Sequence, residues 1–190
     1  MKADSYKIAK VFSSGGDIHY VLPHFQREYA WERDQWHTLL QDAVAIHEEV
    51  AALEDTGQST QNMEHFLGSL VVVNSGTISG TITEFKLVDG QQRLTTISLL
   101  FCALARIVAE TDAALAKKIT RLLVNEDEKG DNFFKVFPTT KYGDRAAYKA
   151  ILQNKEPPQS ESRIPAAFHY LHQQLNVRNK KLVLRMLLLP

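Results

Sequence analysis

Apolar residues recur along the chain with two spacings, and each spacing predicts one kind of element. A spacing of three or four residues, which lines one face of a helix, predicts long helices over residues 33–53 and 93–110. Alternation of apolar and polar residues, or a short apolar run, predicts strands over residues 18–22, 66–73 and 82–88. A segment rich in Gly and Ser separates the last two strands, so we expect them to pair as an antiparallel hairpin.

Capping residues predict three further helices in the second half of the chain. The candidate N-caps are Asp112, Asp144 and Ser162, for helices over 113–124, 145–153 and 163–176. Together the elements predict an α+β fold, in which a small mixed or antiparallel sheet is packed with helices and followed by a helical part. We therefore expect a sheet-containing core in residues 1–110 and a helical extension in residues 111–190.

A polar octapeptide, Asp89-Gly90-Gln91-Gln92-Arg93-Leu94-Thr95-Thr96, joins the third predicted strand to the following helix. The first N–H groups of a helix have no partners within it, and with the helix dipole they attract an anion such as phosphate. Gly90 permits a close backbone approach, Arg93 matches phosphate oxygens, and Asp89 can hold a metal ion or orient a water. Gln91 and Gln92 can both donate and accept hydrogen bonds. In the alternative interpretation this is a tight turn, with the Asp capping the helix and the Arg pairing with a carboxylate.

A second polar and aromatic cluster, within residues 21–31, precedes the first long helix. Gln26 and Arg27 are its polar members, while Tyr29 and Trp31 each combine a large flat ring with one polar group. Such rings suit stacking on a base or closing over a pocket, so we expect Tyr29 and Trp31 to contact DNA or a base. In the alternative interpretation, Trp31 and Phe25 pack in the core and fix the entry angle of the helix.

The patterns L-P-x-F-Q-R-x-Y-x-W-x-x-x-Q-W, F-L-G-S-L-V-V-V and F-K-L-V-D-G-Q-Q-R-L-T-T resemble one protein family. This is the N-terminal domain of GmrSD-type modification-dependent restriction endonucleases and related phage-defence proteins. A weaker resemblance continues through residues 121–125, 137–140 and 144–148, where the chain has a leucine-rich helix end, a Pro-Thr turn and a helix that starts with Asp. The resemblance implies a ParB-like fold, related to sulfiredoxin.

In that family the D-G-Q-Q-R segment stands where ParB-like proteins bind and hydrolyse a nucleoside triphosphate. The resemblance therefore implies catalytic roles for Asp89, Gln91, Gln92 and Arg93. It also implies nucleotide binding by Gln26, Arg27, Gly90, Arg93, Thr95 and Thr96. The cofactor expected with the nucleotide is Mg²⁺, and Asp89 is its candidate ligand.

The expected function is that of a domain that binds and hydrolyses a nucleoside triphosphate in a DNA-restriction or phage-defence protein, without the nuclease part. The alternatives are a modified-DNA-sensing module with no catalysis of its own, and an inactive structural fragment. Family members usually continue into a nuclease, whereas this chain stops at Pro190, after the apolar run 181–189. We expect the chain to be a truncated product or a fragment. We also expect that binding of modified DNA requires the missing region. A homodimer is one expected oligomeric state.

Composition adds limits to this picture. The chain has 22 basic and 22 acidic residues, and its zero net charge predicts weak binding to unmodified duplex DNA, which generally needs a basic face. The single cysteine, Cys102, lies in an apolar helix, which excludes a disulfide framework and points to the reducing cytoplasm. Neither a signal peptide nor a run of eighteen apolar residues is present, so we expect no membrane association.

Overall fold

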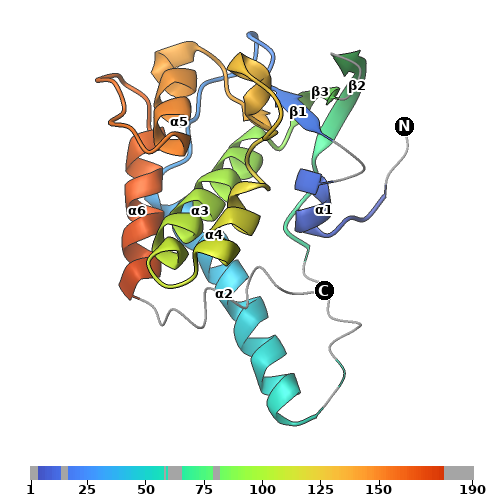
Figure 1. The fold of residues 1–190 in the computed structure, drawn as a ribbon, viewed down its shortest axis with the longest axis vertical. Coiled ribbons are helices and arrows are strands. Elements are labelled where there is room, and N and C mark those ends of the chain that lie inside the picture. Colours follow the sequence, from blue (N-terminus) through green and yellow to red (C-terminus); the bar gives the residue numbers. More distant parts are fainter. Residues whose placement is uncertain (1–3, 14–16, 58, 60–65, 79–81, 178–190) are drawn as a thin grey trace.

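The computed structural model of the chain describes residues 4–13, 17–57, 59, 66–78 and 82–177. These residues form an α+β fold in which a four-stranded mixed sheet packs with six α-helices (Figure 1). The predicted fold class is therefore confirmed. The apolar run 181–189, part of the polar segment 55–62 that follows the first long helix, and part of the hairpin turn lie outside the described residues.

The sheet has the strand order β2-β3-β1-β4. Its strands are β1 (Ile18–Val21), β2 (Val71–Ile78), β3 (Ile82–Asp89) and β4 (Val136–Phe137). The central strand β1 runs parallel to both β3 and β4, whereas β2 and β3 form the predicted antiparallel hairpin. The sheet is therefore mixed, and its edge strand β4 comes from the second half of the chain.

Strand β2 begins later and ends later than the sequence predicts. It continues through the polar stretch 74–77, because pairing with β3 satisfies the backbone there. The register shifts between Asn74 and Gly76, where the Gly76 N–H donates to Asn74 Oδ1 at 2.8 Å and Gly76 has a φ of 102°. A bulge of this kind lets a strand cross a segment with low strand propensity.

The helices follow the apolar periodicity of the sequence closely. They are α1 (Ile8–Ser13), α2 (Arg33–Asp55), α3 (Gln91–Ala109), α4 (Ala113–Thr120), α5 (Asp144–Leu152) and α6 (Ile164–Val177). Five of the six were predicted. The sequence did not predict α1, which is only six residues long and is held by tertiary bonds: the Tyr20 hydroxyl donates to Val11 O and Lys135 Nζ donates to Phe12 O, both at 2.8 Å.

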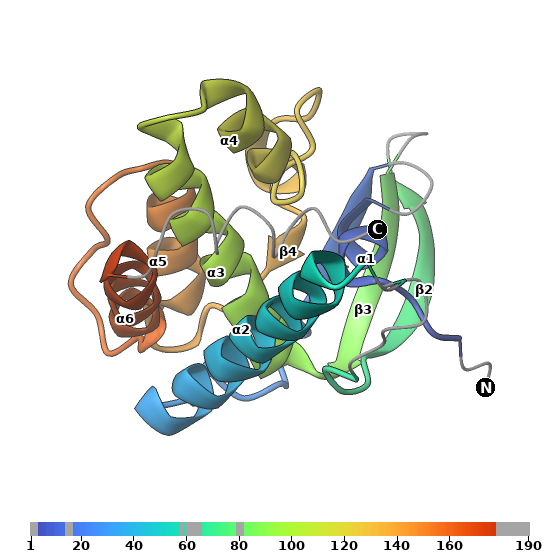
Figure 2. The same cartoon turned by 90° about the horizontal axis from the view of Figure 1, so that it is seen from below.

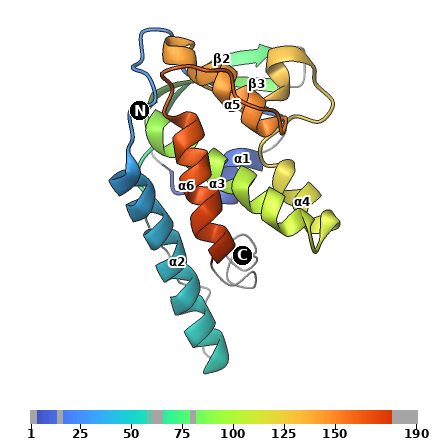
Figure 3. The same cartoon turned by 90° about the vertical axis from the view of Figure 1, so that its left-hand side faces the viewer.

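Helix α3 is the centre of the fold. It packs against α4, α6 and the sheet, and Figures 2 and 3 show it enclosed by its neighbours. Leu94 and Leu99, on different faces of α3, are both completely buried. In length and composition α3 is the one described helix that could cross a membrane, but most of it lies inside the protein. Its apolar character is therefore that of a core helix.

One hydrophobic core extends across the predicted boundary at residue 110. It joins Leu40 and Leu94 from the first part with Phe134, Tyr148 and Leu171 from the second. The second part covers α3 and completes the sheet, so the described residues share a single core.

The three predicted helix caps have different outcomes. Asp112 caps α4, because its Oδ1 accepts the Leu115 N–H at 2.9 Å. The Ser162 hydroxyl accepts the Ile164 N–H at 3.2 Å, at the start of α6. Asp144 is not an N-cap: it is the first residue of α5, the cap position is occupied by Gly143, and the Asp144 side chain turns away to another segment.

We predict that Gly90→Ala destabilises the protein more than Gly130→Ala does. Both glycines have a positive φ, of 87° and 64°, which costs an L-residue about 1–2 kcal/mol. An added Cβ meets nothing within 4 Å at Gly130, but at Gly90 it would lie 2.5 Å from Leu70 Cδ2 and 2.9 Å from Ser69 O. Urea unfolding should show an additional loss of at least about 1 kcal/mol for Gly90→Ala. Equal losses would mean that the turn can move away from Leu70.

Candidate functional site

The two predicted motifs meet, and the side chain of Gln92 joins them. Its Oε1 accepts the N–H groups of Ala30 and Trp31, at 2.8 and 3.1 Å. Its Nε2 donates to Glu28 O at 2.8 Å. The Gln92 side chain therefore binds the backbone of the loop after β1 to the first turn of α3. This role of Gln92 is structural.

Neighbouring residues add further bonds between the two motifs. Gln91 Nε2 donates to Arg27 O at 3.4 Å, and Gln26 Nε2 donates to Val88 O at 2.9 Å, on β3. The hydroxyls of Tyr29 and Thr96 lie 2.6 Å apart. Because the Thr96 hydroxyl donates to a backbone carbonyl of its own helix, the Tyr29 hydroxyl is the donor in this pair. Residues 26–31 are thus bound to α3 along most of their length.

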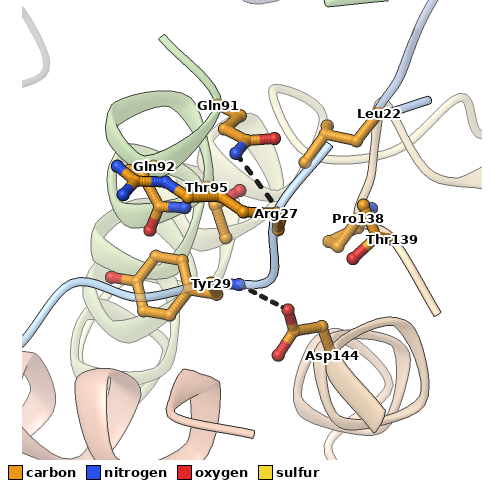
Figure 4. Close-up of a pocket in the computed structure, with 9 residues that line it drawn as sticks. All are labelled: Leu22, Arg27, Tyr29, Gln91, Gln92, Thr95, Pro138, Thr139 and Asp144. Atoms are coloured by element: carbon orange, nitrogen blue, oxygen red, sulfur yellow. Dashed lines mark hydrogen bonds between the residues drawn. The ribbon is translucent and has the colours of Figure 1, made fainter. Parts of the chain in front are cut away.

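A small pocket lies where these motifs reach the start of α5 (Figure 4). It is lined by Leu22, Arg27, Tyr29, Gln91, Gln92, Thr95, Pro138, Thr139 and Asp144. The enclosed free space of the pocket is about 10 Å³, far less than the roughly 300–1,000 Å³ of typical ligand pockets. A ligand larger than a few atoms must therefore bind mainly at its mouth.

The N-terminus of α3 forms one wall of this pocket. The helix starts at Gln91, after Gly90 in the left-handed conformation, and no side chain caps it. Uncapped N–H groups and the positive end of the helix dipole favour an anion at this position. Gln91 Oε1 and Thr139 Oγ1 are also buried here without a described hydrogen-bond partner.

Arg27 and Asp144 provide opposite charges in the pocket. Arg27 is exposed, and its guanidinium makes no hydrogen bond or ion pair with a described residue. Asp144 is 1% exposed and accepts from the Tyr29 N–H and the Ser162 hydroxyl, both at 2.6 Å. Burial raises the pKa of the Asp144 carboxyl, while these two hydrogen bonds oppose the rise and the nearby Glu28 charge adds to it.

Arg93 lies apart from the pocket. Its Nη1 donates to Ser69 O at 3.0 Å, and its guanidinium packs so closely on Gly68 that a Cβ there would lie 2.4 Å from Arg93 Cζ. Three side chains that the resemblance assigns to nucleotide binding, Gln26, Arg27 and Arg93, therefore do not converge on one pocket. Of these three residues, Arg27 alone lines the pocket.

Asp89 also lies outside the pocket lining, as an exposed residue at the end of β3. The described residues contain no group of three His, Cys, Asp or Glu side chains that could hold a metal ion. A site made by Asp89 would therefore need other ligands, such as the phosphates of a bound nucleotide.

The aromatic residues occupy positions that differ from those expected. Tyr29 is 5% exposed, and its ring lies in the core, where it cannot stack on a base. Trp31 is half-buried and packs against the core, as in the alternative interpretation of the sequence. Phe25, the other candidate core residue, is instead 69% exposed and contacts the edge of the His24 ring.

Thr139 and Asp144 are site residues that the sequence interpretation did not assign. Their segments were noted only as weaker parts of the family resemblance, and Asp144 was interpreted as a helix cap. Both segments combine polar residues with a turn, and they follow β4, a strand of two residues that sequence periodicity cannot reveal. The fold brings them beside α3.

We predict that Gln92→Ala lowers the free energy of unfolding by about 2–4 kcal/mol, since it removes the hydrogen bonds of three part-buried backbone groups. The matched control is Gln26→Ala, which removes a single exposed hydrogen bond and should cost less than about 1 kcal/mol. Urea unfolding measures both. If the two variants lost the same stability, Gln92 would not be the residue that holds the loop.

Comparisons with known proteins identify the family. A search of curated proteins finds no match. The family model described as the GmrSD restriction endonuclease, N-terminal domain, matches residues 8–187, which is nearly the whole chain. The match covers both motifs, the helical second part and every residue of the pocket. This chain therefore belongs to the family of GmrSD restriction endonuclease N-terminal domains.

Proposed function

We propose that this domain binds a nucleoside triphosphate against the first turn of α3 and hydrolyses it, as the nucleotide-dependent part of a phage-defence restriction system. Membership of a restriction endonuclease family supplies the biological setting, which is defence against foreign DNA. The observation that carries the proposal is the uncapped start of α3 near Arg27, whose guanidinium is exposed and pairs with none of the described residues. The N-terminus of a helix next to an exposed Arg side chain is an arrangement that binds phosphate.

The size of the pocket limits how the nucleotide binds. Only the terminal phosphate can approach the pocket itself, because most of the enclosed space is already filled by side chains. The sugar and the base then lie outside, at the exposed surface near Arg27. The nucleotide is held mainly by its phosphates in this arrangement, and it gives no strong selection for one base.

The residues of the D-G-Q-Q-R motif divide into two groups in this proposal. Gly90 and Gln91 stand at the phosphate site. Gln92 and Arg93 support it: Gln92 holds the loop that carries Arg27, and Arg93 binds Ser69 O, next to Leu70, which packs on Gly90. A Lys could not replace Arg93 well, because a planar guanidinium packs flat on Gly68.

Mg²⁺ fits this site as a companion of the nucleotide. Since Mg²⁺ is usually held by one or two carboxylates and the substrate phosphates, the exposed Asp89 beside the start of α3 is a suitable protein ligand. The ion would neutralise charge on the phosphates. Thr96 lies deeper on α3, where its hydroxyl binds Tyr29, so its contribution is to hold the site in shape, whereas Thr95 lines the pocket itself.

Arg27→Ala should weaken the binding of Mg²⁺–nucleoside triphosphate by about 1.5–3 kcal/mol, because a charge-assisted bond to phosphate is lost. Isothermal titration with ATP, GTP, CTP and UTP measures the effect. Arg121→Ala is the control, since Arg121 is an exposed residue that pairs with Glu126 outside the pocket. Equal affinity of the wild-type protein and Arg27→Ala would remove Arg27 from the nucleotide site.

A second candidate function is modified-DNA sensing through the loop after β1. The exposed Phe25 ring favours it, because an unpacked aromatic ring beside Arg27 can contact an unstacked base or an apolar modification. The protein has zero net charge, so unmodified duplex should bind only in the non-specific range of about 10⁻⁴–10⁻⁶ M at physiological salt.

For this candidate we predict that Phe25→Ala weakens binding to modified duplex at least about tenfold, or roughly 1.4 kcal/mol, and leaves binding to plain duplex unchanged. Gel shifts with matched modified and plain DNA measure both. Phe66→Ala serves as the control, because Phe66 is also largely exposed but lies on a different segment. Tight binding to plain DNA that ignores the Phe25 change would contradict the sensing role.

A further inference from the structure

Two buried polar atoms in the pocket have no described partner. Gln91 Oε1 and Thr139 Oγ1 belong to side chains that are 7% and 1% exposed, and both side chains line the pocket. Buried polar atoms in native proteins are satisfied in the great majority of cases, by protein groups or by ordered water. The two atoms therefore mark the place of a small polar group between α3 and the segment after β4.

The carboxylate of Asp144 lines the same pocket. One of its oxygens accepts the Tyr29 N–H and the other accepts the Ser162 hydroxyl, so each keeps acceptor capacity for one more bond. In Figure 4 the Asp144 carboxylate and the Thr139 hydroxyl lie on one side of the pocket, whereas the Arg27 guanidinium extends to the other side. The pocket thus has an acceptor-rich side and a cationic side.

The groups that line the pocket have complementary capacity for one water molecule. Gln91 Oε1 and the Asp144 carboxylate are acceptors, and the Thr139 hydroxyl can donate. The free space in the pocket is about that of one water molecule. Three hydrogen bonds are also the usual number for a buried water.

We propose that Asp144 is the general base of nucleotide hydrolysis, and that Asp144, Thr139 and Gln91 hold the attacking water. This inference rests on the proposed function. The water oxygen attacks the terminal phosphorus, and the bond from that phosphorus to the bridging oxygen breaks. The electron pair of that bond leaves on the nucleoside diphosphate, Asp144 takes a proton from the water, and inorganic phosphate is released.

Two observations favour Asp144 over Asp89 for this role. Asp144 is buried beside the start of α3, whereas Asp89 is exposed and does not line the pocket. Burial also raises the pKa of the Asp144 carboxyl, which makes it a stronger proton acceptor than an exposed carboxylate. In addition, its hydrogen bond to the Tyr29 N–H joins the base to the loop that carries Arg27.

The test compares Asp144→Asn with the wild-type chain. Turnover of Mg²⁺–ATP or of the preferred nucleotide should fall by about 10²–10⁴-fold, while the dissociation constant from titration stays within about twofold, because the amide keeps the shape and loses the basicity. Asp127→Asn removes the charge of an exposed residue outside the pocket and should leave turnover unchanged. Undiminished turnover in Asp144→Asn would overturn the proposal.

Thr139→Val provides a second, independent variant in case Asp144→Asn does not fold. It removes a buried hydroxyl without a partner and keeps the volume, so the melting temperature should hold while turnover falls about tenfold through loss of one hydrogen bond to the water. Wild-type turnover in Thr139→Val would also overturn the inference. Hydrolysis by the wild-type chain that persists in both variants would overturn the inference alone, whereas a wild-type chain that does not hydrolyse any nucleotide would contradict the proposed function as well.

Discussion

The fold depends on how the backbone of residues 26–31 is satisfied where it lies against α3. This loop is too irregular to pair with a strand, yet it is partly buried, so its N–H and C=O groups need side-chain partners. Gln92 binds three of them, Asp144 binds the Tyr29 N–H, and Arg163 Nη1 donates to Ala30 O at 2.8 Å. The loop is thereby held by residues of α3 and α5 and by Arg163, the residue before α6.

This constraint also builds the pocket. The residues that bind the loop lie at the starts of their helices, so the helix start of α3 and the first residue of α5 are brought to the same place. A helix start has unpaired donors, and a buried carboxylate has spare acceptor capacity. The arrangement that supplies hydrogen-bond partners to the loop therefore also places donors and acceptors around the small pocket.

Helix α3 differs in polarity between its first turn and the rest of its length. Along most of its length α3 is a core helix, packed on every side by apolar residues, but its first turn carries Gln91, Gln92 and Arg93. The apolar part fixes the helix within the fold, and the polar turn is held rigidly as a result. Lys135, the residue before β4, has a comparable role, because its buried ammonium binds Phe12 O and holds α1.

The sequence by itself determined the long helices, three of the four strands, the α+β class and the family, because apolar periodicity and a polar motif are local properties. Only the tertiary structure decided that Tyr29 is buried and Phe25 exposed, that Arg93 packs on Gly68, and that Asp144 belongs to the pocket. These facts depend on contacts between residues far apart in the chain, such as Tyr29 N–H to Asp144 across 115 positions. No local pattern encodes such a contact, because the side chain that needs a partner and the group that supplies it meet only after the core has formed.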